Sequence, residues 1–166
     1  PSRGLDHGAW VPLRFLFPDA SIPVVPLSLQ PQLGPAHQLA LGRALAPLRE
    51  QGVLLVGSGS LTHNLYEVRM SASEGDAAAY AQEFSAWIRQ AVAAGDLARL
   101  RQALDLASHA ARAHPTSEHF LPLLVAAGAA LAHTPATVLN GGIRHGVLAM
   151  ESYVFGQALD LEFGKP

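Results

Sequence analysis

The sequence contains no cysteine and carries little charge, and both shortages narrow the chemistry open to it. Without Cys there are no disulfides, no Cys-ligated zinc, no iron–sulfur clusters and no thiol nucleophiles. Charged residues make up 14% of the chain and hydrophobic residues 49%, which is too apolar for a disordered protein and enough for a packed core. The 166 residues correspond in size to one ordinary domain.

An excess of basic residues is also missing. The formal net charge is −2, whereas proteins that bind nucleic acid or anionic membranes are normally basic. No apolar run approaches the roughly 18 residues of a membrane-spanning helix. The first ten residues lack the apolar stretch of a signal peptide. We therefore expect a cytoplasmic protein that binds neither nucleic acid nor membrane.

Histidine, by contrast, is abundant: the chain has 8 His beside only 11 Lys and Arg. Histidine is the commonest metal ligand in proteins and a general base near neutral pH. Several of these residues lie in turn-rich segments. His7 follows Asp6, His63 follows a run of Gly and Ser, and His114 and His119 flank a Pro-Thr-Ser turn. These segments are the candidate sites of chemistry.

None of these segments is a self-sufficient motif. The chain has no HExxH, and His114 and His119 are five residues apart, so a regular helix would not place them on one face. The glycines after Val56 form neither a GxGxxG pattern nor a P-loop, and residues 57–60 (GSGS) lack the spacing of a serine nucleophile elbow. Nucleotide binding and serine hydrolysis are therefore unsupported.

The apolar pattern predicts an α/β fold. Residues 22–29 and 53–56 are short apolar runs rich in β-branched residues, typical of buried strands, and residues 34–51 between them have a helical stripe that Pro47 should kink. A strand, a helix and a strand of this length predict two parallel strands joined by a right-handed crossover. Ligands in such sheets bind beyond the carboxyl ends of the strands, which is where His63 lies.

The other expected elements surround this unit. A helix over 5–17 begins at Asp6 as its N-cap, and the helix after Gly95 begins at Asp96. Further helices are expected over 73–94 and from about 118 to 131, and strands over 136–139 and 147–155.

Each His also has a structural interpretation. His7 follows an N-cap, where a half-buried, hydrogen-bonded side chain is the commoner outcome. His63 and His119 are balanced between structural and functional roles. A buried neutral His needs partners for both ring nitrogens, so His119 belongs either to a polar network or to a metal site.

Four segments that occur in order carry a resemblance to a known family. They are GLDHGAWVPLRFLFPDASIPVVPLSL, LREQGVLLVGSGSLTHNL, HPTSEHFLPLLVAAGA and HGVLAMESYVF. Together they resemble the 4,5-DOPA extradiol dioxygenase group of the class III extradiol ring-cleavage dioxygenases, which is related to the catalytic subunit of protocatechuate 4,5-dioxygenase. The resemblance covers nearly the whole chain.

The resemblance implies a three-layer α/β/α domain with a mostly parallel central sheet, of which the N-terminal part is missing here. It also implies insertion of O₂ into a catecholic ring, with a DOPA-like compound as the substrate type. The family uses a mononuclear non-haem Fe(II), and some members of the group hold zinc in the same site. Imidazole ligands that leave coordination positions open suit a metal that must bind both a catechol and O₂.

The resemblance assigns roles to individual residues of this chain. His119 matches a metal ligand. His63 matches a His beside the metal, which acts as the acid–base catalyst in some members and as a metal contact in others. His7 matches a pocket residue that contacts substrate or oxygen and takes part in catalysis. His114 and Asn64 are further candidates for the substrate pocket.

The chain departs from the family in one respect. Family members carry a long segment before the LDHG motif, with two further His ligands, and neither is present here. We therefore expect residues 1–166 to be the C-terminal portion of a single catalytic domain, completed by a missing N-terminal segment or by a partner chain. On this expectation the 166 residues alone bind iron weakly and do not turn over substrate.

Two other functions stay open on the sequence. A zinc-dependent hydrolase would use the same imidazoles and an open water position. An inactive domain that binds small aromatic molecules would need no complete metal site. Consumption of O₂ in the presence of a catechol separates the dioxygenase from both.

Overall fold

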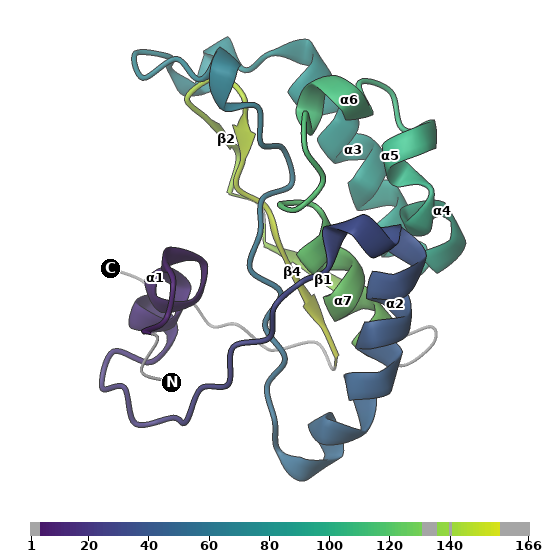
Figure 1. Cartoon of the computed structure of the whole chain (residues 1–166). Helices are drawn as coiled ribbons and strands as arrows, with labels where there is room; N and C mark the ends of the chain where they lie inside the picture. The colour runs from purple at the N-terminus through teal and green to yellow at the C-terminus, as the bar shows by residue number, and fades with distance from the viewer. Residues whose placement is uncertain (1–3, 131–135, 140, 157–166) are drawn as a thin grey trace.

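The structure is a computed structural model that describes residues 4–130, 136–139 and 141–156. All its α-helices except the first form one body on the right of Figure 1, in which α2 packs on α7 and α3 packs on α4 and α6. The α-helices are α1 (His7–Leu16), α2 (Gly34–Leu45), α3 (Ala79–Ala93), α4 (Leu97–Arg101), α5 (Ala103–Leu106), α6 (Ala110–Ala113) and α7 (Leu121–Ala129). Short 3₁₀ turns occupy Pro31–Leu33, Ala46–Gln51, Leu65–Glu67 and Glu74–Asp76.

The core lies among these helices. Phe84 and Ile88 of α3, Leu100 of α4, Phe120 and Leu124 are at most 1% exposed. The rings of Phe84 and Phe120 meet edge to face with their centroids 6.1 Å apart, a favourable geometry for an aromatic pair. Residues that the sequence spreads over helices α2 to α7 therefore form a single apolar cluster.

Two small sheets complete the described part of the fold. β1 (Ala136–Leu139) pairs with β4 (Ser152–Phe155), and β2 (Ile143–Arg144) pairs with β3 (Leu148–Ala149). Both pairs are antiparallel. A mixed α and β architecture is confirmed, but no parallel sheet occurs among residues 4–130, 136–139 and 141–156.

The two strands expected at the centre of the fold are the main difference from the sequence prediction. Residues 22–29 and 53–56 belong to no helix or strand of the structure, and neither segment is paired. No backbone hydrogen bond joins residues 21–29 or 54–59 to any other residue that the structure describes. A strand exists only through the neighbour it bonds to, so the predicted parallel βαβ unit is not formed.

Local signals place most helix ends correctly. The Asp6 side chain accepts a hydrogen bond from the Ala9 backbone as the N-cap of α1, and Asp96 caps α4 in the same way. The helix expected over 34–51 changes to a 3₁₀ turn at Ala46, next to Pro47, and ends at Gly52, whose φ of +79° suits glycine.

Two helices begin later than predicted. Ser73 and Asp76 form a capping box around a separate 3₁₀ turn, so α3 starts at Ala79. The Thr116 hydroxyl bonds to the Glu118 side chain instead of capping a helix, and α7 starts at Leu121. The strand expected over 147–155 is divided into β3 and β4.

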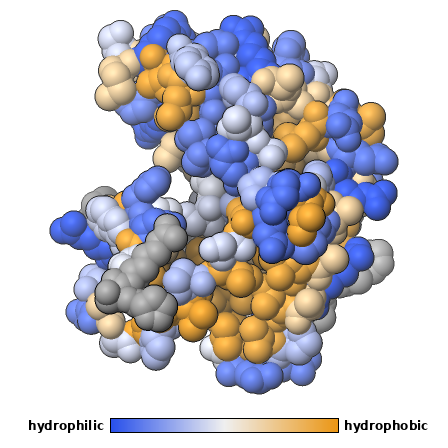
Figure 2. All heavy atoms as spheres, viewed as in Figure 1, coloured by the Kyte–Doolittle hydropathy of each residue, from blue (hydrophilic) through white to orange (hydrophobic). Residues whose placement is uncertain are grey.

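Helix α1 stands apart from the helical body (Figure 1). None of its residues is buried, and the extended segment 17–30 joins it to α2. In the view of Figure 2, which is that of Figure 1, apolar side chains gather in the lower part of the molecule, over the lower part of α2 and the segment that follows it. In the part of the chain that is described, no helix is both long and apolar enough to cross a bilayer.

Candidate metal and catalytic site

The structure brings His63 and His119 together. Their rings are stacked, with centroids 3.4 Å apart and planes at 18°. His63 lies in the loop after the extended segment 53–59, and His119 lies in the turn before α7. The Ser60 amide donates to the His119 carbonyl at 2.8 Å, and the His63 amide donates to the Ala113 carbonyl at 2.8 Å. Backbone hydrogen bonds therefore hold the two loops in register.

The glycines before His63 explain why these loops can approach so closely. A Cβ at Gly59 would overlap the carbonyl oxygen of His119 and lie 3.0 Å from Pro122 Cγ. A Cβ at Gly57 would overlap the Pro122 carbonyl. The Gly-Ser run thus serves close packing of one chain segment on the start of α7, a role other than phosphate binding.

The electrostatics of the pair favour the neutral imidazole at His63. Burial lowers the pKa of His63, and the neighbouring His119 lowers it further. Glu118 opposes this shift, and its carboxylate oxygen lies 3.8 Å from His119 Nε2. A hydrogen bond from Thr116 in turn lowers the pKa of Glu118. A neutral imidazole is the form that accepts a proton or binds a metal.

His114 lies beneath this pair and is 5% exposed. Its Nε2 lies 2.7 Å from the Leu61 carbonyl oxygen, and because a carbonyl only accepts, Nε2 carries the proton. Its Nδ1 has no partner among the described residues. The rings of Phe84 and Phe120 flank it. Burial lowers its pKa to about 4.

We expect His114 to make the folded protein sensitive to mild acid. The unfolded chain takes up the proton near pH 6.5 and the folded chain only near pH 4. This contribution to the free energy of unfolding is therefore fully present above pH 6.5. It falls by about 3 kcal/mol as the pH drops from 6.5 to 4. Urea unfolding at pH 7 and pH 4 measures this loss. H114Q, which cannot titrate, should lose less over the same range, and equal losses would contradict the assignment.

Asn64 holds the loop that carries His63. Its side-chain nitrogen donates to the Arg112 carbonyl at 2.9 Å and to Glu67 at 3.1 Å, and its side-chain oxygen accepts from the Tyr66 amide. The side chain is 7% exposed. In this arrangement Asn64 positions the loop, and its role toward a substrate stays a prediction.

The role of His7 toward the imidazole pair stays a prediction. It is exposed at the start of α1, and no hydrogen bond, ion pair or ring contact joins it to His63 or His119 in the described structure. Its neighbour Gly8 does approach residues 53–59, the segment before His63, because a Cβ at Gly8 would lie 3.8 Å from Ser58 Oγ.

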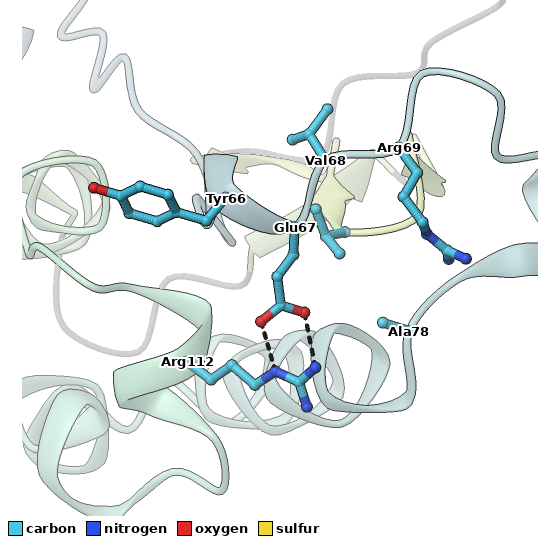
Figure 3. A pocket seen from close by; sticks show the side chains of 7 residues that line it. Tyr66, Glu67, Val68, Arg69, Ala78 and Arg112 are labelled. Carbon is cyan, nitrogen blue, oxygen red and sulfur yellow. Dashed lines mark hydrogen bonds and ion pairs between the residues drawn. The ribbon is translucent and has the colours of Figure 1, made fainter.

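An ion pair that the sequence did not reveal lies next to the site. Arg112 donates two hydrogen bonds to Glu67, at 2.8 and 2.7 Å, and its guanidinium lies 4.2 Å from the centre of the Tyr80 ring. Figure 3 shows this pair on one wall of an open cavity of about 430 Å³, with Arg69 on the other side. The partners are 45 residues apart, and no periodic pattern links them.

The imidazole pair fits part of a metal site. Two neutral imidazoles side by side are suitable donors for Fe(II) or zinc. The described residues contain no group of three or more His, Cys, Asp or Glu side chains placed to hold a metal. Two imidazoles are fewer than the ligands of a stable mononuclear site, and the assignment of His63 and His119 as ligands stays a prediction.

The chain is similar to known proteins in both sequence and structure. The family model described as the catalytic LigB subunit of aromatic ring-opening dioxygenase matches residues 1–159. Proteins named 4,5-DOPA dioxygenase extradiol from Beta vulgaris and Escherichia coli (strain K12) are 42% and 35% identical to this chain, over 153 and 157 residues. The crystal structure of an uncharacterized protein from Escherichia coli K12 matches with a TM-score of 0.81 at 34% identity.

The matches cover this chain more fully than they cover the relatives. Both sequence alignments span 92% of this chain but only 56% and 57% of the relatives. The structural match spans 93% of this chain and 64% of the other. The chain therefore spans little more than half the length of the curated relatives it matches.

Proposed function

Because the chain belongs to the family of the catalytic LigB subunit of aromatic ring-opening dioxygenases, we propose that it is part of an extradiol dioxygenase. The reaction is insertion of O₂ into the ring of a catecholic, DOPA-like substrate. The observation that carries the proposal is the stacked pair of His63 and His119. Gly57 and Gly59 allow the segment before His63 to pack closely against the start of α7, which brings the two imidazoles together.

We assign the metal to this pair. His119 and His63 would hold a mononuclear Fe(II), with zinc as the alternative ion in the same place. A metal bound there would lower the pKa of a catechol's hydroxyl groups and supply the redox chemistry between the ring and O₂. Further ligands come from the portion of the enzyme outside these 166 residues, which also completes a three-layer α/β/α domain. The enzyme acts in the cytoplasm.

The chain's own residues then handle the proton and the geometry. A neutral imidazole has a single free lone pair, so His63 serves either as a metal ligand or as the base. As the base, its unprotonated ring nitrogen, favoured because burial lowers its pKa, accepts the second phenolic proton. His7 contacts substrate or oxygen from α1. His114 holds the Leu61 carbonyl two residues before His63, and Asn64, directly after His63, bonds to the Arg112 carbonyl. Both contacts keep the His63 backbone in place.

The test is O₂ uptake by the complete enzyme, reconstituted anaerobically with Fe(II) and then given L-DOPA or another catechol. We expect O₂ loss in step with a yellow ring-cleavage product. The H63A variant should lose on the order of 10²–10⁴-fold in kcat, the usual cost of removing a general acid–base group. Product formed without O₂ loss, or no product over a panel of catechols, would reject the dioxygenase.

A further inference from the structure

We propose that Thr62 is a positioning residue for His63, because its buried hydroxyl group fastens the loop that carries His63 to strand β3. Thr62 directly precedes His63 and is 0% exposed. The inference deepens the proposed function and rests on it, since the orientation of His63 matters to the reaction only if His63 is a ligand or a base there.

The Thr62 hydroxyl makes two hydrogen bonds to the backbone at β3. It donates to the Val147 carbonyl at 2.6 Å and accepts from the Ala149 amide at 2.8 Å. A residue in a neighbouring antiparallel strand exchanges the same pair of bonds, one with a C=O and one with an N–H. A single side chain therefore joins the loop to β3 in the way that a strand partner would.

The backbone that receives these two bonds is itself held in the core. Val147 and Ala149 are 2% and 3% exposed and belong to the apolar cluster among the helices. Two residues further along the chain, the Glu151 carboxylate accepts two hydrogen bonds from Arg89 of α3. The Thr62 hydroxyl thus reaches a fixed and buried point, where loss of the hydroxyl would leave two backbone groups without their partner.

The neighbouring residues tie the loop to a different part of the chain. The Leu61 carbonyl accepts a hydrogen bond from the His114 ring. The His63 amide donates to the Ala113 carbonyl. A loop that is bonded only along residues 113–114 can tilt about that line of bonds. The bonds of Thr62 to β3 supply a second anchor on another element, and this anchor prevents the tilt.

A tilt of the loop would act directly on the imidazole pair. The rings of His63 and His119 are stacked with their centroids 3.4 Å apart, so a small rotation of the His63 backbone would separate them. Misplacement of a reacting group by about 1 Å can cost roughly 100-fold in rate. Loss of the Thr62 hydroxyl should therefore lower kcat and leave the binding of substrate largely intact.

Two substitutions separate the hydroxyl from the rest of the Thr62 side chain. Thr62→Val replaces the hydroxyl with a methyl group, whereas Thr62→Ser keeps the hydroxyl. In the complete enzyme with Fe(II) and a catechol, we expect Thr62→Val to lower kcat about 10–100-fold, the usual cost of losing a group that orients a ligand, with KM little changed. Thr62→Ser should keep most of the activity. If Thr62→Ser were as impaired as Thr62→Val, the hydroxyl would not be the group that matters and the proposal would be wrong.

Ser85→Ala is the matched control for the loss of a buried hydroxyl. Ser85 of α3 is 2% exposed and donates to the Ala81 carbonyl at 2.7 Å within its own helix, so its removal does not untie the loop of His63. We expect the kcat of the folded Ser85→Ala enzyme to be unchanged. An equal fall in kcat in Ser85→Ala and Thr62→Val would be a general effect of damage to the core and would also reject the proposal.

A spectroscopic measurement tests the position of His63 without metal, catechol or O₂. In the metal-free complete enzyme with ¹³C-labelled His, the Cε1–H signal of His63 is identified by its loss in His63→Gln, and it depends on the ring stacked beside it. We expect Thr62→Val to move or broaden this signal, and Ser85→Ala to leave it in place. An unmoved signal in Thr62→Val would overturn the proposal even in an active enzyme.

The same measurement keeps this proposal separate from the dioxygenase assay. A moved signal supports the role of Thr62 even if no catechol is cleaved, and in that case only the proposed function fails. If Thr62→Val does not fold, Thr62→Ala takes its place, because a water molecule can fill the space beside β3 while the tie to the loop stays broken. The His63 signal of Thr62→Ala then decides in the same way.

Discussion

Replacing His119 with Ala in the complete enzyme is expected to release most of the bound metal and to abolish ring cleavage. His119 is one of the two stacked imidazoles that we assign to the metal, so the substitution removes one ligand of the site. Loss of an outer residue that only orients a ligand already costs roughly 10–100-fold in metal affinity or activity. Loss of the ligand itself should exceed about 100-fold in kcat. Metal analysis after dialysis and O₂ uptake with a catechol measure the two effects.

A second histidine provides the matched control. His109 lies on the surface, 3.0 Å from Glu83 and outside the site, with a φ of +64° that Asn tolerates. His109→Asn therefore removes an imidazole without straining the backbone, and it should keep both metal and activity. A His119→Ala enzyme that retained metal and turned over normally would remove His119 from the site. Equal losses in both variants would point to general destabilisation instead.

The helix ends of this fold follow from local chemistry, which is why the sequence predicts them well. Asp6 and Asp96 accept backbone hydrogen bonds within three residues, and Gly52 needs only a left-handed turn at its own position. Each signal involves atoms that are neighbours in the chain. The late starts of α3 and α7 also depend on close neighbours in the chain. Ser73 and Asp76 cap a separate 3₁₀ turn before α3, and Thr116 bonds to Glu118 before α7.

Strand pairing is a property of distant segments, and here the sequence prediction was only half right. The composition of 22–29 and 53–56 predicts strands, but the structure forms none there, because composition cannot supply the neighbour to which a strand must bond. The predicted parallel sheet was wrong for the described residues for this reason. Strand β1 agrees with its prediction because its partner β4 lies in the same part of the chain.

The candidate site shows the same division. Turn residues placed His63 and His119 at the ends of elements, but their contact depends on Gly59 packing against a carbonyl 60 positions away. The hydrogen bonds of Asn64 to Arg112 and Glu67 left no trace in the periodicity. The sequence thus identifies candidate donors, while the backbone contacts that orient them require the structure.

The backbones of α2 and α7 lie in close contact at Gly42 and Gly128, so adding a methyl group at either glycine should be strongly destabilising. A Cβ at Gly42 would overlap the Val125 carbonyl and lie 2.8 Å from the Ala129 amide nitrogen. A Cβ at Gly128 would overlap the Leu39 carbonyl. Ala is favoured over Gly within a helix by about 1 kcal/mol, but backbone atoms cannot move aside as a flexible side chain can. The helices must separate, so the steric cost wins.

We expect Gly42→Ala to lower the free energy of unfolding by about 3 kcal/mol, at the upper end of the usual cost of overpacking. For a chain of this size that corresponds to a fall in Tm of about 6–12 °C. Gly75→Ala is the control, because the nearest atom to its Cβ position is Ser73 Oγ at 4.0 Å, and it should stay within about 0.5 kcal/mol. Thermal unfolding followed by circular dichroism measures both. A Gly42→Ala protein that kept its full stability would show that α2 and α7 are not in this close contact. The position of His119 would then be in question too, because α7 begins just after it.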